Sequence, residues 1–210
     1  MPHCGQDLRT HILPSKRSVL AGPVIGRLAH QLCTAIAFLH SHNMYHLDIK
    51  PQNLAVNADK DCELTVIDLG WVMSARQPCY VTGAAGTFGY VAPEVQKWLD
   101  WDDAMDELED DEEEPPPPPK YNPQKADSWA IGNVIHILIG ALEYSDSDSD
   151  YDGEDLYVEN REGLLEFGTW VMEERPTMEL ALERLRALED DHTVPRTPSP
   201  VDSAVVALSP

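Results

Sequence analysis

The clearest pattern of apolar and polar positions lies near the start of the chain. Apolar residues recur there at steps of three and four, which is the spacing of one face of an α-helix: Ile25, Leu28, Leu32, Ala35, Ile36 and Leu39. The pattern predicts a helix over residues 25–39. A later apolar stretch, which opens at residues 127–132, predicts a second helix.

Between these two helices, the pattern predicts a small β-hairpin. Residues 54–56 and 64–67 are mainly apolar, and the polar residues 57–63 separate them as a turn. Such a hairpin would place Asn53, just before its first strand, beside Asp68, just after its second. Because carboxylate and amide oxygens are ligands suited to Mg²⁺, we expect the two side chains to be paired metal ligands.

Residues 46–53, His-Leu-Asp-Ile-Lys-Pro-Gln-Asn, place three chemically distinct groups on one short loop. Asp48 can accept a proton, Lys50 can hold phosphate charge, and Asn53 can offer a neutral oxygen to Mg²⁺. Taken alone, Asp-x-Lys-Pro is a common loop composition, and Asp-Leu-Gly at residues 68–70 is a common strand end followed by a turn. The segments that follow decide between these interpretations.

Five segments, in order, resemble motifs of the eukaryotic protein kinases. Residues 46–53 resemble the catalytic loop H-R-D-L-K-x-x-N, with Leu47 where arginine is usual. Residues 68–70 resemble D-F-G, with Leu69 in place of phenylalanine. The other three resemble the segment ending in A-P-E, the D-x-W-x-x-G element and the late arginine that pairs with the A-P-E glutamate: residues 86–94, 127–132 and 174–177.

The resemblance implies a mainly α fold with a small β-hairpin, the large C-terminal lobe of a protein kinase, over residues 1–190. Residues 1–8 resemble the hinge between the two kinase lobes. No Gly-rich loop, strand lysine or partner glutamate precedes this hinge, so we expect the small N-terminal lobe to be absent from these 210 residues. An incomplete sequence would explain the abrupt start, and a genuine fragment that acts by binding is the alternative.

The resemblance also assigns roles to single residues. Asp48 would be the catalytic base, Lys50 would steady the transferring phosphate, and the hydroxyl of Thr87 would bridge the two. Asn53 and Asp68 would hold Mg²⁺. The expected ATP contacts are three hinge residues and one residue under the adenine ring, in that order: Pro2, Cys4, Asp7 and Leu54.

Further residues have expected structural or regulatory roles. Glu94 and Arg175 are expected to form a buried ion pair, and Asp127 is expected to accept hydrogen bonds from the backbone of the catalytic loop. Leu47 cannot pair with a phosphate on the activation segment, as the usual arginine does. We therefore expect that phosphorylation at Thr82 does not switch the activity of the full-length parent.

The implied function is ATP-dependent phosphoryl transfer to serine or threonine hydroxyls of a protein substrate. Thr87, and Lys50 two residues after Asp48, resemble serine/threonine rather than tyrosine kinases. Losing half of the phosphate clamp should cost several orders of magnitude in rate, so we expect the 210 residues alone to have little or no activity. The alternative is a catalytically silent kinase-like protein whose acidic tracts bind basic partners.

The net charge of −22 belongs to two tracts rather than to the whole chain. Residues 100–114 carry eleven acidic and no basic side chains, and residues 143–162 carry nine acidic and one basic. The remainder has 17 acidic and 14 basic residues, a charge of about −3. We expect an acidic, proline-rich insertion over 100–120, an acidic, serine-rich insertion over 143–155 and a disordered tail over 191–210.

Composition also bounds location and partners. The acidic tracts repel phosphate and argue against nucleic acid. No apolar run reaches the length of about 18 residues that a membrane span needs, so we expect no membrane insertion. The four cysteines are scattered, which favours reduced thiols in the cytoplasm or nucleus. Nothing in the sequence indicates an oligomeric state.

Overall fold

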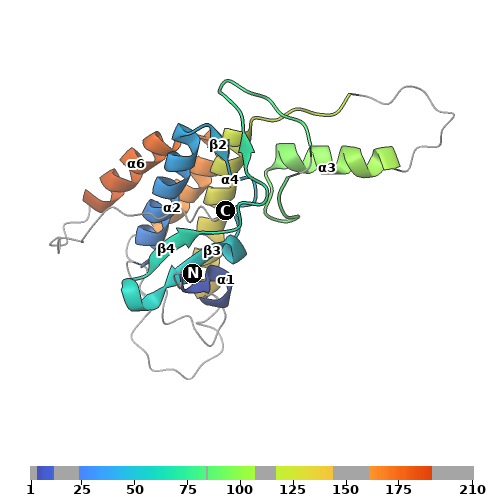
Figure 1. Ribbon diagram of the computed structural model, residues 1–210. Helices are drawn as coiled ribbons and strands as arrows, with labels where there is room; N and C mark the ends of the chain where they lie inside the picture. Colours follow the sequence, from blue (N-terminus) through green and yellow to red (C-terminus); the bar gives the residue numbers. More distant parts are fainter. Residues whose placement is uncertain (1–3, 12–23, 84, 107–116, 144–160, 191–210) are drawn as a thin grey trace.

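The computed structural model describes residues 4–11, 24–83, 85–106, 117–143 and 161–190. Figure 1 shows a mainly helical body with a small β layer at one end of it. The expectations for Pro2, for residues 107–116 and 144–155, and for the tail over 191–210 lie outside the described residues.

Four helices form the body: α2 (Val24–Ser41), α4 (Pro123–Glu143), α5 (Arg161–Glu174) and α6 (Met178–Asp190). The prediction of a helix over residues 25–39 is confirmed, because α2 buries all six of the periodic apolar residues. The second predicted helix is also present, but α4 starts at Pro123 rather than at Asp127. The side chain of Asn122 accepts hydrogen bonds from the backbone of Gln124 (2.9 Å) and Lys125 (3.3 Å), so Asn122 is the cap that starts it.

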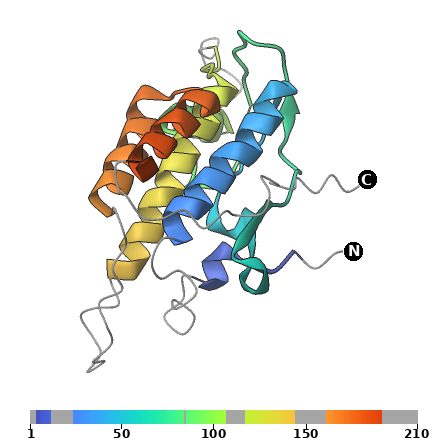
Figure 2. The ribbon, with the colours of Figure 1, turned by 90° about the vertical axis from the view of Figure 1, so that its left-hand side faces the viewer.

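Helices α4 and α5 lie against each other, as do α2 and α6 (Figure 2). The contact between α4 and α5 is close because two glycines meet there. A Cβ atom on Gly132 would lie 2.5 Å from the carbonyl oxygen of Gly168, closer than real Cβ atoms approach such an oxygen. The absence of side chains at this point lets the two helix backbones approach, which fixes the position of α4 in the core.

The predicted hairpin is confirmed. Strands β3 (Leu54–Asn57) and β4 (Glu63–Val66) pair antiparallel, with Leu54 opposite Val66. The sheet also contains β1 (Gln6–Asp7), which pairs with β3. A second ladder joins β2 (Met44–Tyr45) to β5 (Met73–Ser74). These two-residue strands are too short to show a periodic pattern in the sequence.

Helix α3 (Pro93–Asp106) reaches into the range expected to be an acidic, proline-rich insertion. Residues 100–106, the start of that range, are the last turns of this helix. Its first turn is anchored by Val95, which is buried in a small cluster apart from the main core. Figure 1 shows α3 extending away from the helical body. The helix was not predicted from the sequence because its C-terminal half is rich in acidic residues.

The remaining elements are short. Helix α1 (Leu8–His11) follows β1, and single 3₁₀ turns cover Pro51–Asn53 and Ala58–Lys60. Across the parts of the chain that the structure describes, no helix combines the length and apolar character needed to cross a membrane.

Candidate functional site

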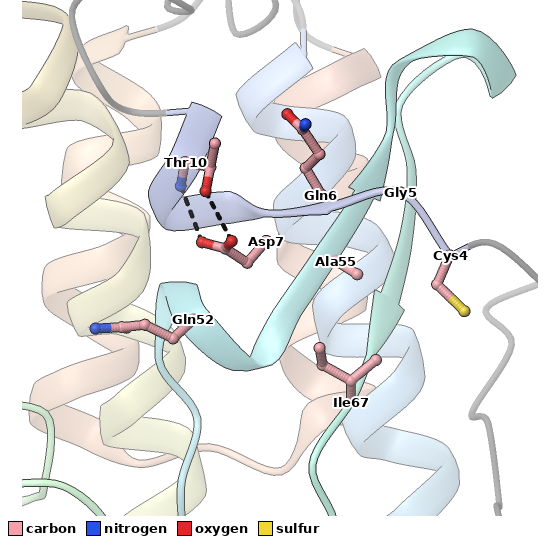
Figure 3. A pocket seen from close by; sticks show the side chains of 8 residues that line it. All are labelled: Cys4, Gly5, Gln6, Asp7, Thr10, Gln52, Ala55 and Ile67. Atoms are coloured by element: carbon pink, nitrogen blue, oxygen red, sulfur yellow. Dashed lines mark hydrogen bonds between the residues drawn. The ribbon is translucent and has the colours of Figure 1, made fainter.

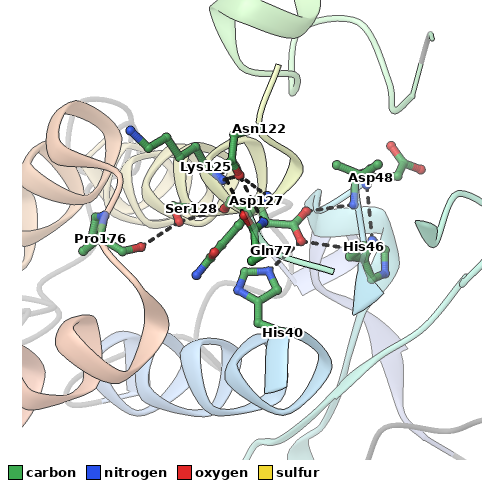
Figure 4. A network of polar contacts seen from close by, with 11 residues as sticks. His40, His46, Asp48, Gln77, Asn122, Lys125, Asp127, Ser128 and Pro176 are labelled. Carbon is green, nitrogen blue, oxygen red and sulfur yellow. Dashed lines mark hydrogen bonds and ion pairs between the residues drawn. The ribbon is translucent and has the colours of Figure 1, made fainter. Parts of the chain in front are cut away.

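Asp127, near the start of α4, holds the beginning of the candidate catalytic loop in place (Figure 4). Its fully buried carboxylate accepts hydrogen bonds from the backbone N–H groups of His46 (2.9 Å) and Leu47 (2.8 Å). The Nε2 atom of His40, from α2, lies 2.9 Å from the same carboxylate. The predicted hydrogen bonds from the loop backbone to Asp127 are therefore present.

The side chain of His46 points back along the loop. The backbone N–H of Asp48 donates to its Nδ1 (3.3 Å), which makes Nδ1 an acceptor and leaves the proton on Nε2. Nε2 lies 3.3 Å from the carbonyl oxygen of Ile67, so it donates there. His46 thus links the catalytic loop to the end of the hairpin that carries Asp68.

Leu47 packs where a kinase usually has an arginine. It is 7% exposed and belongs to an apolar cluster with Tyr45, Ala85 and Ala92. Its φ of 62° is in the left-handed region, which branched and bulky residues rarely adopt. Because its N–H is held by Asp127, this strained conformation is retained. Apolar packing, rather than a charge, joins the loop to the segment that contains Ala85.

Asp48, Lys50 and Thr87 meet as the sequence predicts. The Thr87 hydroxyl donates to Oδ1 of Asp48 (2.7 Å), and the Lys50 ammonium donates to Oδ2 of Asp48 (2.8 Å) and to the Thr87 hydroxyl (2.5 Å). Asp48 is 3% exposed and Lys50 is also largely shielded from solvent. Gly86 allows this approach, because a Cβ on it would lie 2.5 Å from the carbonyl oxygen of Leu47.

Asn53 completes this cluster and lies beside the end of the hairpin. Its side-chain amide donates to the carbonyl oxygen (2.9 Å) and to Oδ2 (2.8 Å) of Asp48. With the nitrogen so engaged, the amide oxygen is available as an acceptor. The backbone N–H of Ile67 donates to the carbonyl oxygen of Asn53 (2.9 Å). This hydrogen bond pairs the two segments and brings Asp68, the residue after Ile67, next to Asn53.

Asp68 is an exposed carboxylate at the end of the hairpin. Its φ is 62°, and one of its oxygens accepts a 3.3 Å hydrogen bond from the backbone of Gly70. Within the described residues, no three histidine, cysteine, aspartate or glutamate side chains gather as a metal site would need. An amide oxygen and one carboxylate are still compatible with Mg²⁺, since this ion usually takes one or two protein carboxylates together with substrate phosphates.

A cavity of about 600 Å³ lies between β1, β3 and the end of β4 (Figure 3). Its size is that of a typical small-molecule site. It is lined by residues 4–7, Thr10, Gln52, Ala55 and Ile67. Two of the expected ATP contacts, Cys4 and Asp7, are therefore in the wall. Both carboxylate oxygens of Asp7 accept hydrogen bonds from Thr10, at 2.9 and 2.7 Å, so Asp7 also caps helix α1.

The expected position of Leu54 needs correction. Leu54 is completely buried and packs in the main core with Val56, on the inner face of β3. Because side chains alternate along a strand, Ala55 faces the other way and lines the cavity, together with Ile67. Ala55 and Ile67, rather than Leu54, supply its apolar floor.

The pair of Glu94 and Arg175 is present but is less buried than expected. The Arg175 guanidinium donates to the Glu94 carboxylate at 2.6 Å, and the side chains are 15% (Arg175) and 30% (Glu94) exposed. Arg175 also donates to the carbonyl of Lys125 (3.2 Å). The ion pair therefore connects the start of α3 to the end of α5 and to α4.

Sequence reasoning missed the parts of the site that depend on strand orientation. No motif marks three residues of the cavity lining, Gln52, Ala55 and Ile67. The alternation of side chains along the predicted strand does indicate that Ala55 and Leu54 face opposite sides of the sheet. No motif in the sequence singles out His40. Its contact with Asp127 joins residues 87 positions apart in the sequence, and no local pattern reveals it.

Residues 1–176 match the family described as protein kinase domain. Relatives include the serine/threonine-protein kinase RAD53 of Saccharomyces cerevisiae, 29% identical over 59% of this chain and 14% of that protein. CBL-interacting protein kinase 30 of Oryza sativa subsp. japonica is 31% identical, over 68% of this chain and 26% of its own length.

Mitogen-activated protein kinase p38b of Drosophila melanogaster is 32% identical over 53% of this chain and 24% of that protein. The chain thus spans about a quarter or less of the length of these relatives. The family match starts at residue 1, so it does not confirm the expectation that only the large lobe is present. The match extends over most of the sequence, and the chain belongs to the protein kinase domain family.

Proposed function

We propose that this chain carries the phosphoryl-transfer site of a serine/threonine protein kinase, with Asp48 as the base toward the hydroxyl of a protein substrate. The observation that carries the proposal is the joint contact of Thr87 and Lys50 with the Asp48 carboxylate. Two segments 37 residues apart converge on one buried carboxylate, which a purely structural loop does not require.

The hydrogen-bond capacity of Asp48 supports its role as a base. An ionised carboxylate has about four lone-pair positions, and Thr87, Lys50 and Asn53 occupy three of them. One position is left to accept the proton of a substrate hydroxyl. Lys50 places a positive charge beside this point, where it would stabilise negative charge that develops on the transferred group.

We propose Mg²⁺ and ATP as the cofactors. The amide oxygen of Asn53 and the carboxylate of Asp68 would hold the metal ion, which screens phosphate charge when bound. The cavity with Ala55 and Ile67 on its floor would take the nucleotide, with Cys4 and Asp7 at its edge. Pro2 stays a further proposed contact. The apolar floor suits a flat aromatic base, and the polar wall suits a sugar.

We also propose that the described residues form the large lobe and that these 210 residues by themselves transfer phosphate poorly. The cavity has walls from β1, β3 and α1, which would cover one side of a nucleotide. Phosphoryl transfer depends on positioning and charge stabilisation, so a nucleotide held on one side would react slowly. The retained set of Asp48, Lys50, Asn53 and Asp68 favours this interpretation over a catalytically silent binding protein.

A chimera tests the proposal. Residues 4–190 would be fused behind the small lobe of a related serine/threonine kinase, and transfer of labelled γ-phosphate to serine and threonine peptides measured with and without Mg²⁺. We expect Mg²⁺-dependent transfer that falls by about 10²–10⁴-fold in Asp48→Asn. Thr87→Ser should keep most of the activity, and Thr87→Ala should lose it. An Asp48→Asn chimera as active as its parent would refute the assignment of the base.

Cytoplasmic or nuclear location is part of the proposal. None of the four cysteines, all of which the structure describes, is in a disulfide bond: Cys4, Cys33, Cys62 and Cys79. Thiols of this kind are typical of reducing compartments.

A further inference from the structure

Helix α3 is held to the rest of the molecule mainly at its start. Glu94 is paired with Arg175, and Val95 is buried in the cluster that contains Leu47. Beyond this first turn, no described helix or strand packs extensively along α3, and Figure 1 shows it extending from the body. A helix of 14 residues gains most of its stability from packing, so a helix along which no described helix or strand packs extensively calls for an explanation.

The acidic charges beyond the first turn of α3 are unfavourable by themselves. Asp100, Asp102 and Asp103 are exposed, and the last turn carries no basic residue. Asp100 and Asp103 stand three residues apart, a spacing at which like charges on a helix repel. The partial negative charge at a helix C-terminus adds to this repulsion. A cationic partner would remove both sources of repulsion.

The aromatic residues of α3 indicate which cationic group the partner presents. Trp98 and Trp101 are half-exposed, and their rings meet at 5.9 Å with a tilt of 48°. A guanidinium group stacks on indole and also binds carboxylates through two parallel hydrogen bonds, whereas an ammonium group does neither as well. An arginine stacks on an indole ring elsewhere in this structure. The guanidinium carbon of Arg184, in α6, lies 4.4 Å from the centre of the Trp170 ring, in α5.

We propose that α3 is a docking helix for an arginine-rich segment of a partner protein. Exposed acidic side chains and partly buried indole rings lie on the same turns, and arginine is the residue that complements both. A second copy of this chain is a poor occupant, because each copy carries a net charge of −22. This interaction goes beyond phosphoryl transfer and does not depend on whether the chain is active.

The test uses the 210-residue protein and a nona-arginine peptide at low and at physiological salt. Binding is followed by the indole N–H signals of Trp98 and Trp101 in two-dimensional NMR. The test variant replaces Asp100, Asp102 and Asp103 by asparagine. A control with the same change in charge replaces three exposed glutamates of α5 and α6 by glutamine: Glu173, Glu179 and Glu183.

We expect the peptide to shift both indole signals, and higher salt to weaken binding. The α3 variant should raise Kd by about tenfold, and the control by about twofold or less. Nona-lysine should bind more weakly than nona-arginine, because it lacks the stacking contact. Circular dichroism of the variant should show that the helix content is kept, so that a lost helix is not mistaken for a lost contact.

Three results would overturn the proposal. One is equal weakening by the α3 variant and by the control, since the effect would then be one of net charge. Another is binding that leaves both indole signals in place. The third is loss of binding only when residues 107–114 are neutralised, with the α3 variant still binding as the parent does; the acidic sequence beyond α3 would then be the binding segment.

Discussion

At the scale of single residues, the geometry of the candidate site depends on one buried carboxylate. Asp127 is inaccessible to solvent and accepts hydrogen bonds from two consecutive backbone N–H groups, those of His46 and Leu47. These N–H groups belong to the turn that directs Asp48 toward Thr87. A change at Asp127 should therefore act on the loop as well as on stability.

We predict that Asp127→Ala destabilises the protein by about 3–5 kcal/mol, because it leaves two buried N–H groups without an acceptor. Asp127→Asn keeps one oxygen acceptor and should cost less. Urea unfolding measures the free energy, and amide hydrogen exchange at His46 and Leu47 measures the local effect. Asp59→Ala, at an exposed position, is the control and should change stability by less than about 0.5 kcal/mol. Unchanged exchange at both amides in Asp127→Ala would contradict this role.

The meeting of three polar residues could be predicted from the sequence because the motifs that carry them resemble those of protein kinases, although Thr87 lies 37 residues after Lys50. Asp48, Lys50 and Thr87 meet as expected. The residues of the cavity floor could not be predicted in this way, because they depend on which face of β3 is turned toward the core. Leu54 packs in the core, and Ala55 lines the cavity.

At the scale of elements, the packing of α4 on α5 rests on the absence of side chains at Gly132 and Gly168. A Cβ on Gly132 would lie 2.5 Å from the carbonyl oxygen of Gly168 and 2.5 Å from Cγ of Met172. Gly140, in the same helix, has nothing within 4 Å of its Cβ position. Gly132 and Gly140 therefore form a matched pair for testing the contact between α4 and α5.

We predict that Gly132→Ala destabilises the protein by about 1–3 kcal/mol, because the helices must move apart. Gly140→Ala should stabilise it by about 0.5–1 kcal/mol, because alanine is the better helix former and meets no obstacle. Thermal or urea unfolding of the two variants measures both effects. A stabilising Gly132→Ala would show that α4 and α5 are not in close contact.

Elements were predictable where an apolar face repeats. Helix α2 shows a clear pattern because it packs in the main core along its whole length. Helix α3 was not predicted, because its acidic C-terminal half has few core contacts and shows no apolar repeat in the sequence. Strand β1 has two residues and exists only through its pairing with β3, which no local pattern reveals.

At the scale of the whole molecule, the stability of the fold should depend on pH through its buried thiol. Cys33 lies at the centre of α2 and is fully buried. Burial raises the pKa of its thiol from 9.0 to about 12. The folded state therefore keeps its proton at pH values where the unfolded chain loses it. This contribution to stability is complete below pH 9 and is lost as the pH rises toward 12.

We predict that the free energy of unfolding falls above pH 9, with Cys33 contributing up to about 1.4 kcal/mol per pH unit. Cys33→Ala should flatten the dependence. A residual slope should persist, because desolvation also raises the pKa values of Cys62 and Cys79. Urea unfolding of both proteins between pH 8 and 10.5 measures the slopes. Parallel curves for wild type and Cys33→Ala would show that the thiol is not buried in the folded state.

We propose that Asn53, Asp68 and the cavity beside them form a Mg²⁺–nucleotide site. NMR titration of the 210-residue chain with ATP, with and without Mg²⁺, tests it most directly. We predict weak, Mg²⁺-dependent shifts at Asn53, Ala55, Ile67 and Asp68, and their loss in Asp68→Ala with an otherwise unchanged spectrum. Shifts that arise elsewhere, that are the same without Mg²⁺, or that persist in Asp68→Ala would contradict the account.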